Sequence, residues 1–369
     1  MENIRPWLAL KYVPGVGDCL YKNLLERFGS PALVFKASGE ELSAVEGISR
    51  RAAEAIMAGP PSVAVNAELC RVRQHGCRII PYSHEDYPPL LREIPDPPPL
   101  LYVTGRLAGS MPAVSIVGSR KATRYGKDMA RSLASDLAGR GIAVVSGLAR
   151  GIDTAAHEGA VSAAGQTVAV LGSGLSMLYP AENRRLAERI SECGAVVSEF
   201  SMQEEPNAYN FPKRNRIISG MCHGTVVVEA AAKSGSLITA RLAGEQGREV
   251  FAVPGNINSR TSQGAHNLLK QGARLVTSAE DVIEEFPHLF LKSQEIRDRD
   301  PNGNSRGELT DEETRVYELL EPYPVHIDWL QSRLGMDTGR IAAVLLNLEI
   351  KGLAVQLPGK YFATHGEIS

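Results

Sequence analysis

The sequence predicts an α/β protein whose core is a doubly wound parallel sheet. From Ala113 onward, seven short apolar runs alternate with segments of helical apolar spacing, which is typical of parallel strands joined by crossover helices. Short motifs of Gly, Ser and Arg follow several of these runs, and loops at the carboxyl edge of such a sheet bind ligands. The seven runs are 114–117, 142–145, 168–171, 195–197, 225–228, 250–253 and 275–277.

Composition limits the function classes. A chain of 369 residues that is 43% hydrophobic suggests two or three domains with a sizeable core. The formal net charge is -2, so any anion site must be a local patch. The five cysteines are widely spaced and form no C-x-x-C pair, which argues against a disulfide frame or zinc site. Because the sequence shows no secretory signal and no membrane-length apolar run, we expect a soluble, cytoplasmic protein without a bound metal.

Residues 1–76 predict a helical domain of the helix-hairpin-helix or SAM-like kind. Their apolar residues follow helical spacing, and two glycine turns, 13–17 and 45–49, each precede a helical pattern. Such turns present main-chain NH groups to a nucleic-acid phosphate. Glycine also simply ends one helix before another begins, and small helical bundles of this kind often mediate protein contacts. The sequence leaves both interpretations open.

Three further regions follow. Residues 77–290 form the predicted core, and their proline-rich stretches at 87–89 and 95–99 predict an extended connector in front of the sheet. Residues 291–307 are polar with almost no apolar anchor and predict a flexible linker. Residues 308–369 combine three helical stretches with a hairpin, which indicates a winged helix.

The winged helix is basic at few positions. Its third helix carries Arg340 and Lys351 but otherwise mostly apolar residues. We therefore favour a protein-contact or regulatory role over DNA binding for this domain.

The strand-end motifs indicate a phosphate-binding face. Glycine allows a sharp turn and close approach to the main chain, helix starts attract anions, and arginine offers a planar donor fork for phosphate oxygens. Loops at one sheet edge converge even when they are far apart in sequence. The motifs are Gly118-Ser119-Arg120, residues 146–151, Gly172-Ser173-Gly174 and residues 212–216.

Two common nucleotide-binding motifs are incomplete in this sequence. Met177 stands where a dinucleotide fingerprint needs its third glycine, and Ala232 and Val227 replace the two glycines of a P-loop before Lys233-Ser234. Nucleotide hydrolysis and a dinucleotide cofactor are therefore not supported.

A cluster of basic residues is a more specific signal for anion binding than these partial motifs. Lys213, Arg214 and Arg216 precede an apolar helix, and no acidic residue lies between Glu205 and Glu229. We therefore expect these cations to lack local partners and to bind an external anion. Nearby aromatic residues either stack on bases or pack in the core, and both readings stay open. They are Tyr179, Tyr209 and Phe211.

Several acidic residues read as structural. Asp153 and His157 are spaced to share a metal or water, but Asp153 is well placed to cap the following helix. Glu199 and Glu229 follow apolar strands, and we prefer hydrogen bonding to loop NH groups over activation of water.

Together these motifs resemble the DNA-processing protein A family, also called Smf, over nearly the whole chain. The matching segments are 117–120, 146–153, 172–174, 179–180, 214–220, 234–240 and 253–256. The resemblance implies an extended Rossmann-like core with flanking helical and winged-helix domains. It further implies a homodimeric, non-enzymatic protein without cofactor that binds and protects single-stranded DNA in natural transformation and loads the RecA recombinase.

The resemblance also implies a set of DNA-binding residues. They are Ser119, Arg120, Arg184, Lys213, Arg214 and Arg216, with Gly118, Gly147 and Gly174 shaping the loops. Family members often carry lysine at the position of Arg184. The family's dimer and recombinase faces fall near residues 264–269.

Two alternatives remain. A nucleotide phosphoribohydrolase on the same fold would use Glu229 at its strand end, although residues 220–225 replace the P-G-G-x-G-T loop of such enzymes. A regulator acting through the winged helix would bind duplex DNA.

Overall fold

The computed structural model describes residues 3–287, 311–317, 319–320, 325–350, 354–357 and 359–364. The chain divides into two compact units, Met1–Pro287 and His288–Ser369, and each is described by itself. The predicted linker 291–307 lies outside the described residues.

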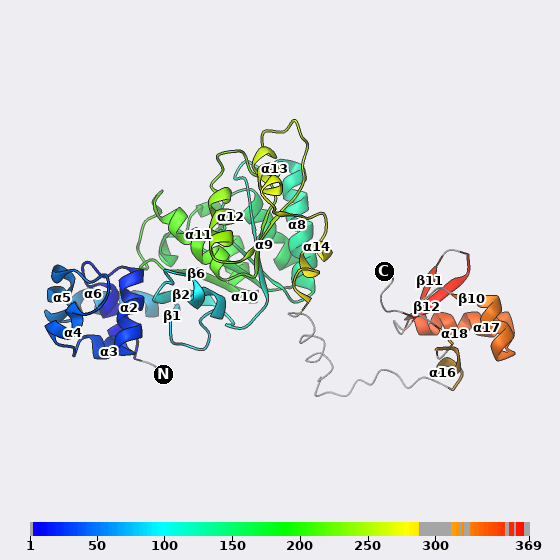
Figure 1. The fold of residues 1–369 in the computed structure, drawn as a ribbon, viewed down its shortest axis with the longest axis horizontal. Coiled ribbons are helices and arrows are strands. Elements are labelled where there is room, and N and C mark those ends of the chain that lie inside the picture. The colour runs from blue at the N-terminus through cyan, green and yellow to red at the C-terminus, as the bar shows by residue number, and fades with distance from the viewer. Residues whose placement is uncertain are drawn as a thin grey trace. The chain divides into compact units, whose positions relative to one another are not determined.

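Six helices open the first unit. Their core includes Trp7 and Leu24 and continues into Leu100 and Tyr102 of the sheet, so the helices pack directly against the sheet edge (Figure 1). The predicted boundary at residue 76 stays a prediction. The helices are α1 (Ile4–Lys11), α2 (Asp18–Phe28), α3 (Pro31–Val34), α4 (Gly39–Ser43), α5 (Arg50–Met57) and α6 (Ser62–Gln74).

A nine-stranded sheet forms the centre of this unit, in the order β1-β2-β6-β5-β4-β3-β7-β8-β9. The seven predicted runs are β3 to β9, and these strands pair in parallel. The strands are β1 (Arg78–Pro81), β2 (Leu100–Gly105), β3 (Ala113–Val117), β4 (Ala143–Ser146), β5 (Thr167–Val170), β6 (Ala195–Ser198), β7 (Gly224–Val227), β8 (Glu249–Ala252) and β9 (Arg274–Leu275).

The prediction of an extended connector before β3 is wrong. β2 pairs antiparallel with both β1 and β6, and α7 (Pro89–Glu93) lies between β1 and β2. The proline-rich stretches misled because they fall outside the strands: Pro89 begins a helix, where the missing NH is tolerated, and residues 95–99 end just before β2.

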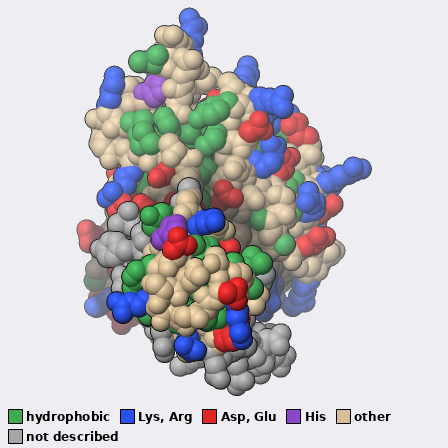
Figure 2. Space-filling view, turned by 90° about the vertical axis from the view of Figure 1, so that its right-hand side faces the viewer, with side chains coloured by type: hydrophobic (Ala, Val, Ile, Leu, Met, Phe, Trp, Pro, Cys, Tyr) green, Lys and Arg blue, Asp and Glu red, His purple; other side chains and the backbone are tan. Residues whose placement is uncertain are grey.

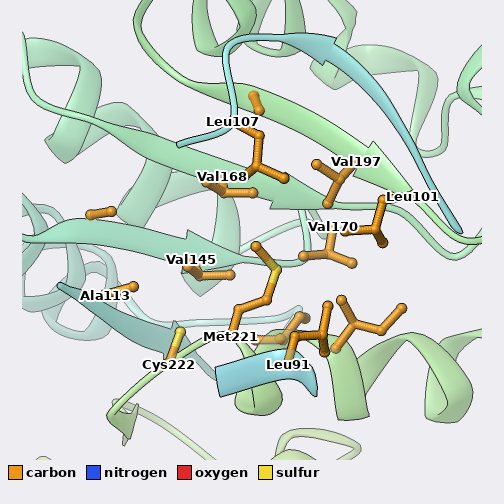
Figure 3. Close-up of a cluster of buried hydrophobic side chains, with 14 of the residues drawn as sticks. Leu91, Leu101, Leu107, Ala113, Val145, Val168, Val170, Val197, Met221 and Cys222 are labelled. Atoms are coloured by element: carbon orange, nitrogen blue, oxygen red, sulfur yellow. The ribbon is translucent and has the colours of Figure 1, made fainter. Parts of the chain in front are cut away.

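Helices cover the sheet, and the strands β3 to β7 bury both faces. Val145, Val168, Val170 and Val197 point toward Met221 in one core cluster (Figure 3). The alternate residues Ala169 and Val196 pack in a second cluster, as the two-residue period of a strand requires. The helices are α8 (Arg124–Gly139), α9 (Ile152–Ser162), α10 (Arg184–Cys193), α11 (Asn210–Gly220), α12 (Ser236–Glu245), α13 (Gln263–Lys270) and α14 (Glu280–Ile283).

The second unit is the predicted winged helix. Val316, Leu330, Leu345 and Phe362 form its core. Arg340, the base noted in the third helix, donates through Nε to Glu312 at 3.2 Å, so its charge is already paired. Lys351 lies outside the described residues. The elements are α16 (Asp311–Tyr317), β10 (Val325–His326), α17 (Ile327–Leu334), α18 (Thr338–Ile350), β11 (Ala354–Leu357) and β12 (Tyr361–Thr364).

No helix among the described residues has the length and apolarity needed to cross a bilayer.

Candidate nucleic-acid interface

A cleft of about 820 Å³ lies at the carboxyl edge of the sheet. β3 pairs with β4 on one side and β7 on the other, so the chain order reverses there, and ligands bind outside such switch points in open α/β sheets. We call this space the cleft. Its lining includes Gly118, Ser119, Arg120, Lys121, Ala149, Phe211, Arg214, Asn215, Ser234, Gly235, Ser236, Thr239 and Thr261.

A second pocket of about 200 Å³ adjoins the cleft, and we call it the side pocket. Arg120, Phe211 and Arg214 line both spaces, whereas Gly147 and Tyr179 line the side pocket. The same two arginines therefore face two adjoining spaces.

Phe211 connects the two arginines. The guanidinium carbons of Arg120 and Arg214 lie 5.1 Å and 6.0 Å from the centre of its ring. Tyr179 also packs against Phe211, with ring centroids 6.0 Å apart. Because arginine stacks on aromatic faces, Phe211 helps to orient both guanidinium groups toward the ligand space.

Arg214 is buried, with 4% of its surface exposed. Its Nη1 donates to the carbonyl of Gly147 at 2.5 Å and to that of Val170, while Nε has no hydrogen-bond partner among the described residues. Burial lowers the pKa of Arg214 to about 10. The side chain therefore remains cationic at neutral pH, and its charge is not paired within hydrogen-bond distance to a carboxylate.

Gly147 makes room for Arg214. A Cβ at this position would lie 2.5 Å from Nη1 of Arg214, closer than real contacts allow. The loop glycine and the helix arginine thus fit as a pair, although they are 67 residues apart.

Asp153 holds the loop after β4. Its carboxylate accepts hydrogen bonds from the NH groups of Gly147 at 3.1 Å and Ala149 at 3.4 Å. The prediction that it caps its own helix is wrong, since these NH groups belong to the preceding loop. His157 beneath it is buried, bonds Thr167 through Nδ1 at 2.8 Å, and its pKa is lowered to about 3 by burial.

Glu229 follows β7 in the chain, and its side chain holds the residue that precedes α8. Its two carboxylate oxygens accept hydrogen bonds from the NH of Thr123 at 2.9 Å and its hydroxyl at 2.6 Å. The prediction of loop NH bonding is therefore confirmed for Glu229. The first turn of α12 carries no acidic residue, and its turn Ser234-Gly235-Ser236 lines the cleft. That helix start can accept an external anion.

The nine predicted site residues separate into two groups. Gly118, Ser119, Arg120 and Arg214 line the cleft, and Gly147 lines the side pocket. The other four are absent from both linings within the described residues. Lys213 and Arg184 are exposed, on α11 and at the start of α10, whereas Gly174 and Arg216 are buried.

Arg216 is not an unpaired cation, contrary to the prediction for the basic cluster. Its guanidinium pairs with Asp18 at 2.9 Å, Asp96 at 3.2 Å and Glu199. The prediction that it lacks partners was wrong because all three carboxylates lie outside the stretch between Glu205 and Glu229.

Gly174 supports the loop without facing the ligand. A Cβ there would lie 2.1 Å from the carbonyl oxygen of Ser201 and 2.2 Å from that of Met202. The position requires glycine because two backbones approach each other.

Sequence reasoning missed several lining residues. Lys121 follows Arg120 directly, and its position after a strand-end motif was an available signal. Asn215 lies between two predicted arginines, whereas Thr261 carries no local signal and reaches the cleft through the fold.

The aromatic residues differ in exposure. Tyr209 is 81% exposed and Tyr179 is 46% exposed, so core packing is the wrong reading for both. Phe211 is half-buried under the two arginines. In the described part of the chain, no group of three or more His, Cys, Asp and Glu side chains is placed to hold a metal ion.

Comparison with known proteins agrees with this geometry. Residues 78–287 match the family described as DNA recombination-mediator protein A, and residues 301–360 match the DprA winged helix domain. Protein Smf of Escherichia coli is 41% identical over 322 residues, covering 85% of this chain and 84% of that protein. Protein Smf of Synechocystis sp. is 34% identical over 384 residues, covering 96% of each chain.

Solved structures show the same relationship. The X-ray structure of DNA processing protein A from Streptococcus pneumoniae superposes with a TM-score of 0.68 and 34% identity, covering 77% of this chain and 99% of that one. The protein from Helicobacter pylori, whose structure is described as showing a single-stranded DNA binding mode, gives 0.52 and 29% identity over 59% of this chain and 96% of that one. The chain therefore belongs to the DNA recombination-mediator protein A family, whose members are also named DprA and Smf.

Proposed function

We propose that this protein binds single-stranded DNA in the cleft and side pocket, protects it, and as a cytoplasmic homodimer loads RecA recombinase onto it during natural transformation. One observation carries the DNA part: Arg120, Lys121 and Arg214 converge with the Ser234–Ser236 turn and the Phe211 ring at one sheet edge. Cations and helix-start NH groups suit phosphates, and aromatic faces suit bases.

Two adjoining spaces that share Arg120 and Arg214 favour a polymer over a single nucleotide, because a strand needs several phosphate sites in a row. Arg184 and Lys213 are exposed outside both spaces. We propose that they contact phosphates beyond the cleft, while Gly118, Gly147 and Gly174 shape the loops. Ser119 would donate its hydroxyl within the cleft.

A binding role has more support than the phosphoribohydrolase alternative. Both carboxylate oxygens of Glu229 accept hydrogen bonds from Thr123, so this side chain is engaged in holding the start of α8. Glu229 is 3% exposed and lines a separate pocket of about 430 Å³. A general base must reach its substrate with a free oxygen, and both oxygens of Glu229 are already bonded to Thr123.

The homodimer and the RecA contact are proposed for the surface around α13. Ile257 is 82% and Leu275 54% exposed. Hydrophobic side chains also gather on one face of the first unit (Figure 2). Within the predicted segment, Gly264 and Ala265 are buried, while Leu268 and Leu269 are partly exposed. An apolar surface of this kind is typical of protein contacts.

The DNA proposal is tested by fluorescence anisotropy with labelled single and double strands over a range of salt. We expect Arg120→Ala to weaken single-strand binding about tenfold and to lower the salt slope by about 0.7, as for the loss of one phosphate contact. Arg124→Ala is the matched control, since Arg124 is 96% exposed nearby and lines neither space. Equal affinity of the two variants would refute the cleft as the DNA site.

The partner proposal needs separate measurements. Light scattering of Ile257→Lys should show a smaller species than the native chain while single-strand binding in a dilute sample persists. RecA filament assembly on strands coated with single-strand-binding protein should accelerate when the native chain is added. A native chain without effect on assembly would refute RecA loading and leave DNA binding standing.

A further inference from the structure

Arg216 is the buried centre of a charge cluster that joins three separate segments. Asp18 begins α2, Asp96 precedes β2, and Glu199 follows β6, and each carboxylate contacts the one guanidinium. The carbonyl of Asp96 also accepts from Nη1 at 2.6 Å. Only 6% of the Arg216 side chain is exposed.

The N-terminal helices contribute a second cation. Lys11 of α1 donates through Nζ to the carbonyl of Glu199 and lies 5.5 Å from the ring centre of Tyr102. Its pKa is lowered by burial. We define the seam as Lys11, Asp18, Asp96, Glu199 and Arg216.

The seam and the cleft lie on opposite sides of α11. Successive residues of a helix are turned by about 100°, so positions 214 and 216 are turned by about 200°. Arg214 lines the cleft, and Arg216 faces the N-terminal helices through Asp18. The seam therefore holds α11 from the side opposite its ligand-facing residues.

The charges of the seam argue against a direct DNA contact by Arg216. Three carboxylates surround two cations, so the cluster has no surplus positive charge for a phosphate. The same contacts give the first glycine turn, residues 13–17, a structural role. The turn places the start of α2 so that Asp18 pairs with Arg216 of the core.

We propose that the seam positions α11 for DNA binding: Asp18, Asp96 and Glu199 hold Arg216, which sets Arg214 and Phe211 toward the strand. The N-terminal helices then support DNA binding through α11, and the glycine turn 13–17 does not itself contact DNA. This inference rests on the proposed single-strand binding. Asp18 and Arg216 are positioning residues, and Lys11 completes the seam.

The test compares Asp18→Asn with Asp18→Glu, which keeps the charge, and with the control Glu285→Gln. Glu285 pairs with Arg274 at 2.6 Å and is 22% exposed, similar to the 34% of Asp18, but it lies beside edge strand β9. We expect Asp18→Asn to weaken single-strand binding about threefold with an unchanged salt slope, because an ion pair is lost and no phosphate contact is. Asp18→Glu should recover part of the loss, and the control should match the native chain.

Hydrogen exchange gives a readout without DNA. The α11 amides should exchange faster in Asp18→Asn than in the native chain or the control. Equal or tighter DNA binding by Asp18→Asn, with native exchange in α11, would overturn the positioning role. A lowered salt slope would also overturn it, because that slope reports lost phosphate contacts. If the native chain itself binds no single strands, the proposed function fails instead.

Discussion

Arg214 and Arg216 are two residues apart on α11, yet the cleft and the seam surround a buried guanidinium with different groups. In the cleft, Arg214 donates to the carbonyls of Gly147 and Val170, and burial lowers its pKa to about 10. In the seam, burial also disfavours the charge of Arg216, but Glu199, Asp96 and Asp18 outweigh it and raise its pKa.

The difference separates a binding cation from a structural one. The hydrogen bonds of Arg214 go to neutral carbonyl oxygens, and the Asp153 carboxylate favours its charge through space without a hydrogen bond to it. Arg214 therefore keeps a positive field that an incoming anion can use. A guanidinium held by carboxylates has that field cancelled and instead joins segments of the fold. Each of the following predictions changes one side of this comparison.

Arg216→Ala breaks the seam and should have the largest effect on stability. It leaves Glu199 buried without its main cation, and removal of one partner of a buried pair costs about 3–5 kcal/mol. Urea unfolding measures this as a lower free energy of unfolding for the first unit. Arg124→Ala, at an exposed side chain, should leave that free energy nearly unchanged. A loss for Arg216→Ala as small as for this control would contradict the structural role of the seam.

Gly147→Ala acts on the cleft. The new methyl group would lie 2.5 Å from Nη1 of Arg214 and must displace it, which we expect to cost about 1–3 kcal/mol as overpacking. Single-strand binding should weaken in the same variant. Gly139→Ala in α8 is the control, because no atom lies within 4 Å of its added methyl group. Native DNA affinity in Gly147→Ala would show that the placement of Arg214 is unimportant.

His157 tests the cost of burial below the cleft. Its pKa falls from 6.5 to about 3 on folding, so the unfolded chain alone binds a proton as the pH drops below 6.5, and stability falls. Between pH 7 and pH 5 this group should remove about 2 kcal/mol. Urea unfolding of the native chain and His157→Gln at both pH values measures the difference. Asp153, whose pKa burial raises, acts in the opposite direction in both proteins. The same pH dependence in both would exclude His157 as its source.

Glu182→Gln should have the smallest effect of these variants, and that effect is on single-strand affinity. Glu182 accepts two hydrogen bonds from Arg150, at 2.8 Å and 2.7 Å, beside the side pocket. Neutralising it frees a cation next to the strand, which should raise single-strand affinity about twofold and steepen the salt slope. Anisotropy titrations with Glu188→Gln as control measure this change. Unchanged binding would place the DNA path away from Arg150.

The sequence predicted the positions of the strands better than it predicted which cations are paired. Apolar runs for β3 to β7 were readable because strands buried on both faces need continuous apolar residues. β1 and β2 were missed because the proline-rich stretches 87–89 and 95–99 between them indicated a connector. Arg120 was predicted from its strand-end motif and lines the cleft.

Tertiary contacts decided the remaining site residues. Arg214 and Arg216 share one local pattern, and nothing near them in sequence distinguishes cleft from seam. The difference arises from Gly147 and Asp18, which lie 67 and 198 residues away. Likewise, Thr261 lines the cleft without any motif.

The sequence by itself determined the parallel strands of the sheet, the winged helix and the edge where the Gly, Ser and Arg loops converge, because apolar periodicity and strand-end glycines are local properties. The tertiary structure alone decided which cations face a ligand. A charge becomes available or cancelled according to the oxygens around it, and folding brings those oxygens from distant segments.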